Sequence, residues 1–507
     1  IYKEYADERI RPHTLEIDKG LFSVEPLLKE MHELGFCGIV IPKEYGGLGS
    51  SYVHYVLAVE ELSKASGPVA KSVSGQTNMC FSILHYGTEE QKQKYVVPWV
   101  KGEKRSAFTL TEPGAGSDAA GMQTTAELIN GEFVVNGTKA FITGAREADF
   151  FQTYCQFKAP DGTKSPICLL IDVHECEGIT IGRNEDLMGM RASSVAEVIF
   201  DNVHVPAENL LGQIGKGFHA AMSTLDAGRL GISAVCVGMA QDAVDQTVKY
   251  TKERMQFGKP IIRFAAVAEM LSNMKAKLQG VRALLYETTR FVEVYKQYGH
   301  IAHERPLEGD ERQEMKFYNR LADGFTPLVK LFSSEYANQQ AYDAIQIHGG
   351  SGFMKDYPCE RLYRDARIMN IYEGTSQLQV VAVTKGTFME QIERYAAAEY
   401  SQPMQPVVAK LKELTAKFSE MTAHVEAGDK EVCGFKDFHA RRLVETAGHI
   451  IITYLLARQA GESEEYADSA KIFCKLAEGK ISEAYTYVMN STLEDVALFR
   501  AVAEEAE

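Results

Sequence analysis

The sequence predicts a mainly α-helical fold with a small β domain, either a barrel or a sandwich, near its middle. Apolar residues recur with helical spacing over residues 1–104 and again from residue 209 onward, whereas short β-favouring runs fill residues 105–208. The run "SQPMQP" precedes a last helical stretch. Because 507 residues suffice for several domains, we expect domains at 1–104, 105–208, 209–399 and 400–507.

Helices are expected throughout the first domain. The run "SVEPLLKEMHELGF" has helical spacing and a stop signal at Gly35, and "YVHYVLAVEELSKAS" has the same spacing. The segment "IPKEYGGLGSS" between them is rich in glycine, which indicates a loop.

The second domain carries hairpin signals. Two Asn-Gly pairs, Asn130–Gly131 and Asn136–Gly137, lie between β-favouring runs. Asn-Gly favours tight hairpin turns because both residues tolerate positive φ, so we expect a hairpin at each pair. Further strands are expected at "FFQTYCQF", "SPICLLIDV" and "VAEVIFDNVHVP".

The third domain returns to long helices. "GISAVCVGMAQDAVDQTVKYTKERMQF" and "AAVAEMLSNMKAKLQGVRALLYETTRFVEVYKQY" are each long enough to cross a helix bundle. The charged run "GHIAHERPLEGDERQE", within an insert near residues 296–320, is expected to link two helices. Three or four amphipathic helices should follow residue 400.

Composition excludes several classes of function. A net charge of −15 argues against nucleic acid or an anionic membrane as the main partner. The nine cysteines are widely spaced and form no CxxC pair, so we expect free thiols in a reducing, cytoplasmic compartment and no metal site. No apolar run approaches 18 residues, and "IYKEYADERI" does not suit a signal peptide, so no integral membrane segment is expected.

Two motifs in the β domain could bind a ligand. "FTLTEPGAGSD", residues 108–118, offers small residues, backbone N–H groups and hydroxyls to phosphate or carbonyl oxygens, although such letters also make ordinary turns. In "KAFITG", Phe141 could lie against a planar ring and Thr143 could offer its hydroxyl to a ring nitrogen; the alternative is a plain strand.

Three motifs in the helical domain have plain structural explanations as well. In "LDAGRLGIS", Asp226 and Arg229 open a long helix, where an acid often only compensates the dipole. In "KERMQFGKP", Arg254 and Phe257 close a helix. "QIHGGSGF" is a glycine-rich break after a helix, and His348 within it is expected to pack or cap rather than react.

The last motif is "NIYEGTSQLQ", residues 370–379. Thr375 or Ser376 is a suitable N-cap for the following helix, whose start could receive a diphosphate. Taken alone, this local sequence predicts that Glu373 is a surface-exposed carboxylate.

In this order, "TEPGAGSD", "KAFITG", "RMQFGKP", "QIHGGSGF" and "IYEGTSQ" resemble the acyl-CoA dehydrogenases, over about residues 1–395. The resemblance implies an N-terminal helical domain, a β-barrel domain and a C-terminal four-helix-bundle domain, here with an extra helical extension. It also implies FAD as cofactor, an acyl-CoA substrate, an electron-transferring flavoprotein as partner, and a role in fatty acid β-oxidation. Because that family shares FAD between subunits, we expect at least a homodimer.

The resemblance carries the family's functional residues onto this chain. Glu373 matches the catalytic base, and no metal is implied. Substrate contacts are expected from Ser117, Asp226, Arg229, Tyr372 and Gly374. FAD contacts, with Arg254, Phe257 and residues 346–350 coming from the neighbouring subunit, are expected from Phe108, Leu110, Thr111, Gly116, Ser117, Phe141, Ile142, Thr143, Arg254, Phe257, Phe264, Gln346, Ile347, Gly349, Gly350, Thr375 and Gln377.

Three positions depart from relatives. Phe141 stands where many carry tryptophan, and Ala265 stands where a glutamine usually contacts the cofactor. Some relatives place their catalytic glutamate in the stretch matching "LDAGR", at the position of Gly228 here. Because glycine cannot act as a base, this strengthens Glu373.

The chemistry implied is removal of the thioester α-proton by Glu373, whose pKa burial should raise. The Glu373 N–H is expected to donate to the thioester oxygen, while the β-hydrogen leaves as hydride to the flavin, giving a trans-2-enoyl-CoA. Alternatives are an acyl-CoA oxidase using O2 and a non-catalytic family member. A decarboxylating dehydrogenase of a dicarboxyl-CoA also stays open. The extension is expected to cover surface that shorter relatives use for tetramers.

Overall fold

The computed structural model describes residues 1–383, 388–431 and 433–504, apart from the side chains of residues 226, 227 and 303. It divides into two compact units. The first unit comprises residues 1–239 and 361–373, and the second comprises residues 240–360 and 374–507. No helix among the described residues is long and apolar enough to cross a membrane.

The first unit begins with helices, as expected. They are α1 (Tyr2–Tyr5), α2 (Thr14–Asp18), α3 (Glu25–Glu33), α4 (Tyr52–Ser63), α5 (Gly67–Tyr86), α6 (Glu89–Gln91) and α7 (Val97–Val100). The predicted stop at Gly35 is confirmed, because α3 ends two residues earlier and Gly35 has a left-handed φ of 76°.

A mixed β-sheet follows these helices. Its strands are β1 (Ser106–Thr109), β2 (Thr125–Ile129), β3 (Glu132–Thr143), β4 (Phe150–Lys158), β5 (Lys164–Asp172), β6 (Ile179–Ile181), β7 (Val195–Pro206) and β8 (Leu210–Leu211). Their order is β6-β7-β3-β2-β4-β5-β8, and β1 pairs with β4 in parallel. The three longer strands predicted from sequence match β4, β5 and β7.

The central β domain is confirmed, but the expected barrel is not: the end strands β6 and β8 do not pair with each other in the described sheet, so it is not a closed barrel. Both end strands are very short, so they offer few backbone groups for closure. One face of the sheet packs on α5 and α7 through Phe150, Tyr154 and Trp99. The strands bury the other face in a cluster that includes Phe133, Phe151 and Ile167.

The two Asn-Gly pairs have different roles. Asn130 and Gly131, with φ of 53° and 87°, form the predicted hairpin turn between β2 and β3. The hairpin expected at Asn136–Gly137 is wrong, because this pair lies inside β3 where the register with β7 shifts. A β-carbon at Gly137 would lie 2.5 Å from Oγ1 of Thr124, so the bulge there needs a glycine.

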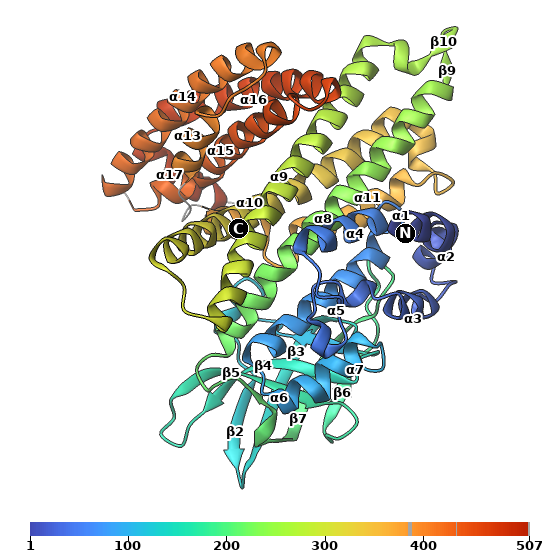
Figure 1. The fold of residues 1–507 in the computed structure, drawn as a ribbon, viewed down its shortest axis with the longest axis vertical. Helices are drawn as coiled ribbons and strands as arrows, with labels where there is room; N and C mark the ends of the chain where they lie inside the picture. Colours follow the sequence, from blue (N-terminus) through green and yellow to red (C-terminus); the bar gives the residue numbers. More distant parts are fainter. Residues whose placement is uncertain (384–387, 432, 505–507) are drawn as a thin grey trace. The chain divides into compact units, whose positions relative to one another are not determined.

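Three long helices follow the sheet. α8 (Gly217–Glu253) begins in the first unit and continues into the second. α9 (Ala265–Glu304) and α10 (Gly309–His348) pack side by side in the second unit (Figure 1). The link between them is shorter than expected, residues 305–308, because Glu308 and Glu311 form a capping box that starts α10 early. Most of the charged insert is therefore helical.

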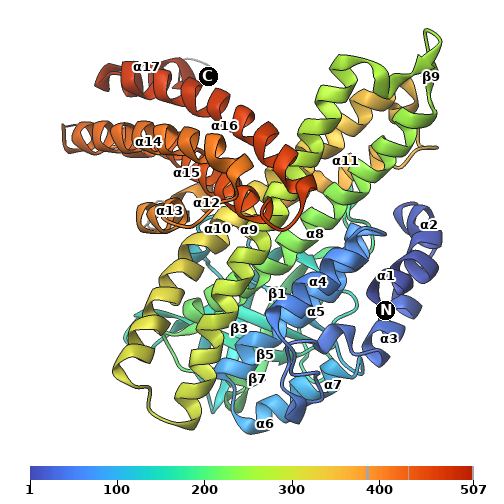
Figure 2. The same cartoon turned by 45° about the horizontal axis from the view of Figure 1, so that its top comes forward.

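The remaining elements are short, except at the C-terminus. They are β9 (Met255–Gln256), β10 (Lys259–Pro260), α11 (Cys359–Arg367), α12 (Ser376–Val383) and α13 (Phe388–Ala396). The extension consists of α14 (Gln405–Glu431), α15 (Phe435–Gln459), α16 (Glu464–Asn490) and α17 (Leu493–Glu504), as expected. α14, α15 and α16 pack together, and α15 and α16 also contact α9 (Figure 2).

Candidate functional site

Glu373 lies in the bend between α11 and α12, where two consecutive residues have left-handed backbone conformations. Its φ is 55°, and that of Gly374 is 92°. Glycine adopts such a φ freely, whereas a residue with a side chain incurs a cost of order 1 kcal/mol or more. The surroundings must therefore hold Glu373 in place, as is common for residues at functional sites.

Helix α8 brings a glycine against the carboxylate of Glu373. A β-carbon on Gly228, which is buried, would lie 2.8 Å from Oε2 of Glu373 and 3.6 Å from Nδ2 of Asn78. Real β-carbons do not approach other atoms so closely, so a side chain at residue 228 would displace the carboxylate. Glycine at position 228 therefore leaves room for the Glu373 carboxylate.

A buried polar network stands beside this contact. The Tyr55 hydroxyl lies 2.9 Å from Oγ of Ser74 and donates to Oδ1 of Asn78 at 3.1 Å. Nδ2 of Asn78 donates to Oγ of Ser74 at 3.1 Å. Burial, reinforced by the negative charge of Glu373, raises the pKa of Tyr55, so the hydroxyl stays protonated and keeps donating.

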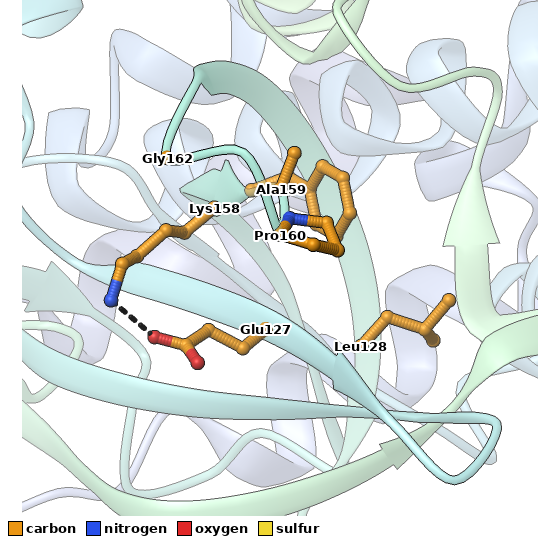
Figure 3. Close-up of a pocket in the computed structure, with 7 residues that line it drawn as sticks. Glu127, Leu128, Lys158, Ala159, Pro160 and Gly162 are labelled. Carbon is orange, nitrogen blue, oxygen red and sulfur yellow. Dashed lines mark hydrogen bonds and ion pairs between the residues drawn. The ribbon is translucent and has the colours of Figure 1, made fainter.

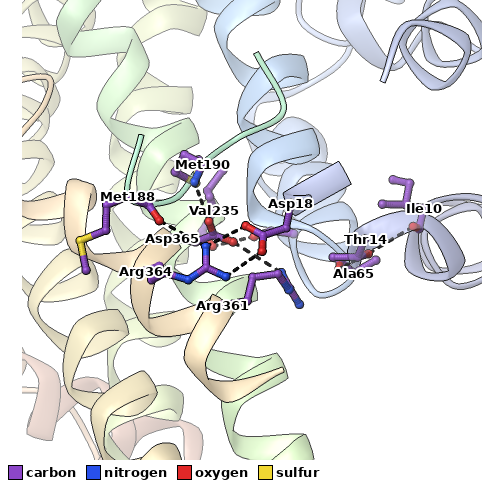
Figure 4. Close-up of polar contacts among 11 residues, drawn as sticks. Ile10, Thr14, Asp18, Ala65, Met188, Met190, Val235, Arg361, Arg364 and Asp365 are labelled. Carbon is purple, nitrogen blue, oxygen red and sulfur yellow. Dashed lines mark hydrogen bonds and ion pairs between the residues drawn. The ribbon is translucent and has the colours of Figure 1, made fainter. Parts of the chain in front are cut away.

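Helix α11 leads to Glu373 and is fastened to the first unit (Figure 4). Nη1 and Nη2 of Arg364 donate to the two carboxylate oxygens of Asp18 at 2.8 and 2.7 Å. The N–H of Met190 donates to the buried Asp365 carboxylate at 2.6 Å. Bidentate and charge-assisted hydrogen bonds fix geometry strongly, so they set where the Glu373 bend begins.

The other side of the bend is held within the second unit. The Gly374 carbonyl accepts from Nζ of the fully buried Lys330 at 2.7 Å and from Nε2 of Gln379 at 2.9 Å. The Ser376 hydroxyl donates to Oε1 of Glu335 at 2.7 Å, and Nη2 of Arg441 lies 3.3 Å from the same oxygen. Arg441 belongs to α15, so the C-terminal extension shares a carboxylate with the first residue of α12 inside the second unit.

The predicted N-cap is confirmed at Thr375, whose Oγ1 accepts from the N–H of Leu378 at 3.3 Å. Gln377 is exposed at the start of the same helix, and Thr375 is half-buried. The half-buried Tyr372 donates its hydroxyl to Sδ of Met369 at 3.1 Å.

The loop after β1 is fastened to β3 by a buried ion pair. Nζ of Lys139 lies 2.8 Å from Oε1 of Glu112 and 3.0 Å from the Leu110 carbonyl. The Glu112 carboxylate also accepts from the N–H groups of Gln123 and Thr124, at 2.6 and 2.9 Å. The "TEPGAGSD" and "KAFITG" motifs are therefore brought together, with the Ala140 N–H donating to the Thr111 carbonyl at 2.9 Å.

These two motifs form an open cradle of glycine backbone, hydroxyls and one exposed aromatic ring. β-Carbons on Gly114 and Gly116 would meet nothing within 4 Å, so the loop backbone is open to a ligand. Phe141 is 70% exposed with a φ of 58°, so its ring leaves the sheet. The half-buried Thr143 follows it. The exposed Ser117 and half-buried Thr111 add hydroxyls.

Three of the predicted FAD residues in the first unit point into the protein. Ile142 and Leu110 are buried in apolar clusters, so only their main chains are available to a cofactor. Phe108 is half-buried with its ring 4.9 Å from that of Tyr154.

The other predicted cofactor residues lie in the second unit, mostly exposed. Phe257 stands on the turn between β9 and β10, is 92% exposed and has a φ of 49°. Its ring meets that of Phe264 edge-on at 6.1 Å. Arg254, Gln346, Gly349 and Gly350 are exposed, and Ile347 is buried. Their role toward a neighbouring subunit stays a prediction.

One helix-end assignment is wrong, a second is confirmed in part, and the packing expected for His348 is confirmed. α8 starts at Gly217, so Asp226 and Arg229 lie well inside the helix rather than opening it. The Asp226 side chain lies outside the described residues, and Arg229 is half-buried. α8 ends at Glu253 and the Arg254 N–H donates to the Tyr250 carbonyl at 2.8 Å, so Arg254 closes the helix as expected, whereas Phe257 belongs to the turn between β9 and β10. His348 packs as expected, stacked on Tyr250 at 4.2 Å with Nδ1 2.7 Å from the Ala344 carbonyl.

The polar residues of α4 and α5 beside Glu373 were not predicted from the sequence. Lys71, Ser74 and Asn78 are three and seven residues apart, a spacing that places them on one face of α5. This spacing was a signal available in the sequence. Its meaning depends on packing, because only the folded chain brings Tyr55 and Glu373 to the same face.

A separate surface cavity lies on the β-sheet, away from this cluster in the chain (Figure 3). Its volume is about 410 Å³, and β2, β4 and the following loop line it. Lys158 and Glu127 form an exposed ion pair there, at 2.8 Å. None of the predicted functional residues lines it, so it is not the candidate site.

Family profiles match the chain along most of its length. The "acyl-CoA dehydrogenase" N-terminal, middle and C-terminal domains match residues 2–103, 107–203 and 215–388. A further profile, "acyl-CoA dehydrogenase C terminal", matches residues 384–496.

Individual relatives and a solved structure agree with these profiles. A 3-(aryl)acrylate reductase of Clostridium sporogenes is 40% identical over 75% of this chain and 95% of its own. The CarC subunit of the caffeyl-CoA reductase–Etf complex of Acetobacterium woodii is 37% identical over 75% and 95%. An acyl-CoA dehydrogenase of Bacillus anthracis complexed with FAD has a TM-score of 0.82 at 28% identity, covering 96% of this chain and 86% of its own.

Proposed function

Because this chain belongs to the acyl-CoA dehydrogenase family, whose members are oxidoreductases acting on CH–CH groups, we propose that it dehydrogenates an acyl-CoA thioester to a trans-2-enoyl-CoA. FAD is the cofactor, as in the Bacillus anthracis structure. The proposed base is Glu373. The observation that carries this assignment is the position of the carboxylate, which a left-handed backbone holds against Gly228 of α8.

Glu373 serves the step that is hardest without an enzyme. The α-proton of a thioester is weakly acidic, so a carboxylate must be positioned within hydrogen-bond reach of it. The ion pair that fastens α11 within the first unit keeps the start of the Glu373 bend fixed, which lowers the entropy cost of reaching the reactive geometry.

Negative charge grows on the thioester oxygen as the proton leaves. The main-chain N–H of Glu373 is the proposed donor to that oxygen, and a donor already fixed in place stabilises the charge without reorganising. FAD, when bound, accepts the hydrogen and electron pair that leave the β-carbon. Proton loss to Glu373 and two-electron transfer to FAD together balance the conversion of the C–C single bond to a double bond.

The open cradle is the proposed FAD site. The ring of Phe141 supplies an aromatic face, Thr143 and Thr111 supply hydroxyls, and the Gly114–Gly116 backbone supplies N–H groups for the diphosphate. The exposed Arg254 and Phe257 are proposed to reach the FAD of a second subunit, which makes the unit at least a homodimer.

An electron-transferring flavoprotein is the proposed redox partner, because the Acetobacterium woodii relative is a subunit of an Etf complex. Two relatives are named as reductases, so the reverse reaction, reduction of an enoyl-CoA, is the second candidate. The same residues serve both directions, with Glu373 returning the proton to the α-carbon.

The test is an anaerobic titration of the purified, yellow flavoprotein with a panel of saturated acyl-CoAs. We expect the flavin absorbance to bleach and mass spectrometry to show an acyl product lighter by two hydrogens. Bleaching by no acyl-CoA in the panel would overturn the function. Stoichiometric peroxide during aerobic turnover would replace the dehydrogenase with an oxidase.

A further inference from the structure

The side chains of Tyr55, Ser74 and Asn78 form a closed ring of hydrogen bonds. Tyr55 has a single hydroxyl hydrogen and donates it to Oδ1 of Asn78, so the Ser74 hydroxyl must be the donor in its 2.9 Å contact with the Tyr55 oxygen. The Asn78 amide closes the ring by donating an N–H to Oγ of Ser74. All three residues are at most 5% exposed, so the ring is shielded from water.

The ring leaves one donor unused, the second N–H of the Asn78 amide. A primary amide carries two N–H donors, and only one of them has an acceptor within the described part of the chain. A buried N–H group without an acceptor is costly, and such groups in native proteins call for an explanation by a partner or by a function. The surroundings of Asn78 on α8 supply that explanation.

Helix α8 brings the Asn78 amide and the Glu373 carboxylate to one point. This is the point where Gly228 would place a β-carbon, and its three nearest described atoms are Oε2 and Cδ of Glu373, at 2.8 and 3.5 Å, and Nδ2 of Asn78, at 3.6 Å. One turn further along α8, a β-carbon on Gly231 would overlap the Ser74 and Tyr55 hydroxyls. Two glycines therefore let the ring and the carboxylate pack next to each other on the α8 backbone.

The negative charge of Glu373 extends to the ring. Burial is the main reason that the pKa of Tyr55 is raised, and the charge of Glu373 raises it further. The Asn78 amide borders the same point as Oε2 and therefore lies in the same electric field. An N–H dipole at that place stabilises an ionised carboxylate more than a neutral one.

We propose that Asn78 is a positioning residue for Glu373, whose spare amide N–H faces the carboxylate and stabilises the ionised form that accepts the α-proton. This inference rests on the proposed dehydrogenase function. The ring orients the amide, because its other N–H and its carbonyl oxygen are both engaged. Asn78 acts through Glu373 and needs no contact with the substrate.

Ionisable groups also surround Glu373 on each neighbouring element. Among the described side chains they are Tyr55 of α4, Lys71 of α5, Arg229 of α8, Tyr372 of the bend, and Asp365 of α11, which acts on Tyr372. All of them except Tyr55 are unchanged in every variant proposed below. A change in the pH dependence of an Asn78 variant therefore reports the amide.

The test is the pH dependence of anaerobic flavin bleaching in the holoenzyme, followed by stopped flow from pH 6 to pH 10. The substrate is saturating butyryl-CoA or, where that does not bleach wild type, the most active acyl-CoA of the panel. The limiting rate then reports the ionisation of the base in the substrate complex. The variants are Asn78→Leu, Asn78→Asp, Tyr55→Phe and Tyr55→Phe/Asn78→Leu, each checked for flavin content and Tm.

Ser82→Ala is the matched control. Ser82 is a buried residue of the same helix, and its hydroxyl donates to Oε1 of Gln152 at 2.6 Å. We expect this variant to lower Tm while the midpoint of the pH profile stays at the wild-type value. It separates the loss of a buried hydrogen bond on α5 from the loss of the amide that faces Glu373.

Asn78→Leu should move the acid limb of the pH profile to higher pH by about one unit, because the ionised base loses a stabilising dipole. The rate should be about tenfold lower than wild type below that limb and close to wild type at high pH. Asn78→Asp should move the limb further, since a second carboxylate repels the first. Tyr55→Phe should move it less, and the double variant no further than Asn78→Leu, because Tyr55 acts through Asn78.

A rate that falls by the same factor at every pH would show that Asn78 only supports the fold. That result, or a wild-type midpoint in folded Asn78→Leu, would overturn the inference and leave the dehydrogenase function intact. If Asn78→Leu does not fold, Asn78→Asp, which has nearly the same shape as wild type, decides the question by the same criterion. If no acyl-CoA bleaches the wild-type flavin, the function itself fails and the inference fails with it.

Discussion

Oε2 of Glu373 lies 2.8 Å from the point where residue 228 would place a β-carbon. The carboxylate of the α11–α12 bend therefore occupies the space that a side chain on α8 would need. Residues 228 and 373 both face this point, and only one of them can place a side chain there. This relationship explains why glycine at 228 and glutamate at 373 occur together in this chain.

Gly228→Ala should slow the chemistry without removing the cofactor. The added methyl must displace the Glu373 carboxylate, and a shift of a few tenths of an ångström in a catalytic group costs rate steeply. We expect the bleaching rate to fall by about tenfold or more, with flavin absorbance retained. Gly479→Ala is the matched control, because a β-carbon there meets nothing within 4 Å in α16. An unchanged rate in Gly228→Ala would show that the contact does not constrain the carboxylate.

The double substitution Gly228→Glu/Glu373→Gly should recover part of the activity that Glu373→Gly loses. A carboxylate on α8 would reach the same point from the other side, and glycine at 373 would relieve the left-handed strain. We expect Glu373→Gly to be at least ~100-fold slower than wild type in anaerobic bleaching, a typical contribution of a general base. If a folded, flavin-containing double variant recovers no bleaching activity, the position of the carboxylate oxygen alone is not sufficient for the base.

Glu335→Ala should slow flavin bleaching by loosening the bend that carries Glu373, without weakening substrate binding. Ser376 and Arg441 would both lose their common partner, and an unsatisfied buried hydroxyl costs about 1–3 kcal/mol. We expect kcat to fall several-fold with little change in KM. Glu445→Gln is the control, because it removes the other carboxylate bound by Arg441, at 2.8 Å, and leaves Ser376 untouched. A change confined to KM would argue that the extension does not position Glu373.

Glu112→Gln should destabilise the loop that forms the FAD cradle. Burial alone would raise the pKa of Glu112, but hydrogen bonds from Lys139, Thr124 and Gln123 lower it overall. Breaking a buried pair on one side costs about 3–5 kcal/mol, so Tm at neutral pH should fall and flavin should dissociate more readily. Glu112→Gln/Lys139→Met should regain part of the loss.

The same pair predicts a pH dependence of stability. A carboxyl group whose pKa is lowered by folding stabilises the protein above its unfolded value, about 4.3, and that stabilisation is lost as pH falls through the folded value. Thermal melts from pH 7 down to pH 3 should therefore show a smaller fall in Tm for Glu112→Gln than for wild type. Parallel curves for the two proteins would contradict the assignment.

Local sequence patterns predicted most of the elements but not how they join. β4, β5 and β7 are rich in β-branched and apolar residues, and these strands lie where the sequence predicted them. The dipeptide Asn-Gly was read alike at both places, yet it forms a turn at 130–131 and a bulge at 136–137, because strand pairing with β7 decides between them. Local sequence patterns also could not predict whether the sheet closes, because closure depends on whether the short end strands pair with each other.

The candidate site shows the same division. Glu373 was found through the order of five motifs, whereas its own neighbours in sequence indicated a surface residue. Lys71 and Tyr55 were not predicted as site residues because the segments around them have an ordinary helical pattern. Their proximity to the site arises only when α4, α5 and α8 pack together. Buried polar residues at spacing i, i+3 and i+7 are a signal worth seeking in such helices.

The central claim, that Glu373 removes the α-proton, is tested most directly by Glu373→Gln in the full-length holoenzyme. Glutamine keeps the size and the backbone of the bend but cannot accept the proton. Stopped-flow anaerobic bleaching with an acyl-CoA that reduces the wild-type flavin should be slower by at least ~100-fold, while flavin content and Tm stay near wild type. Bleaching at the wild-type rate in that variant would contradict the account.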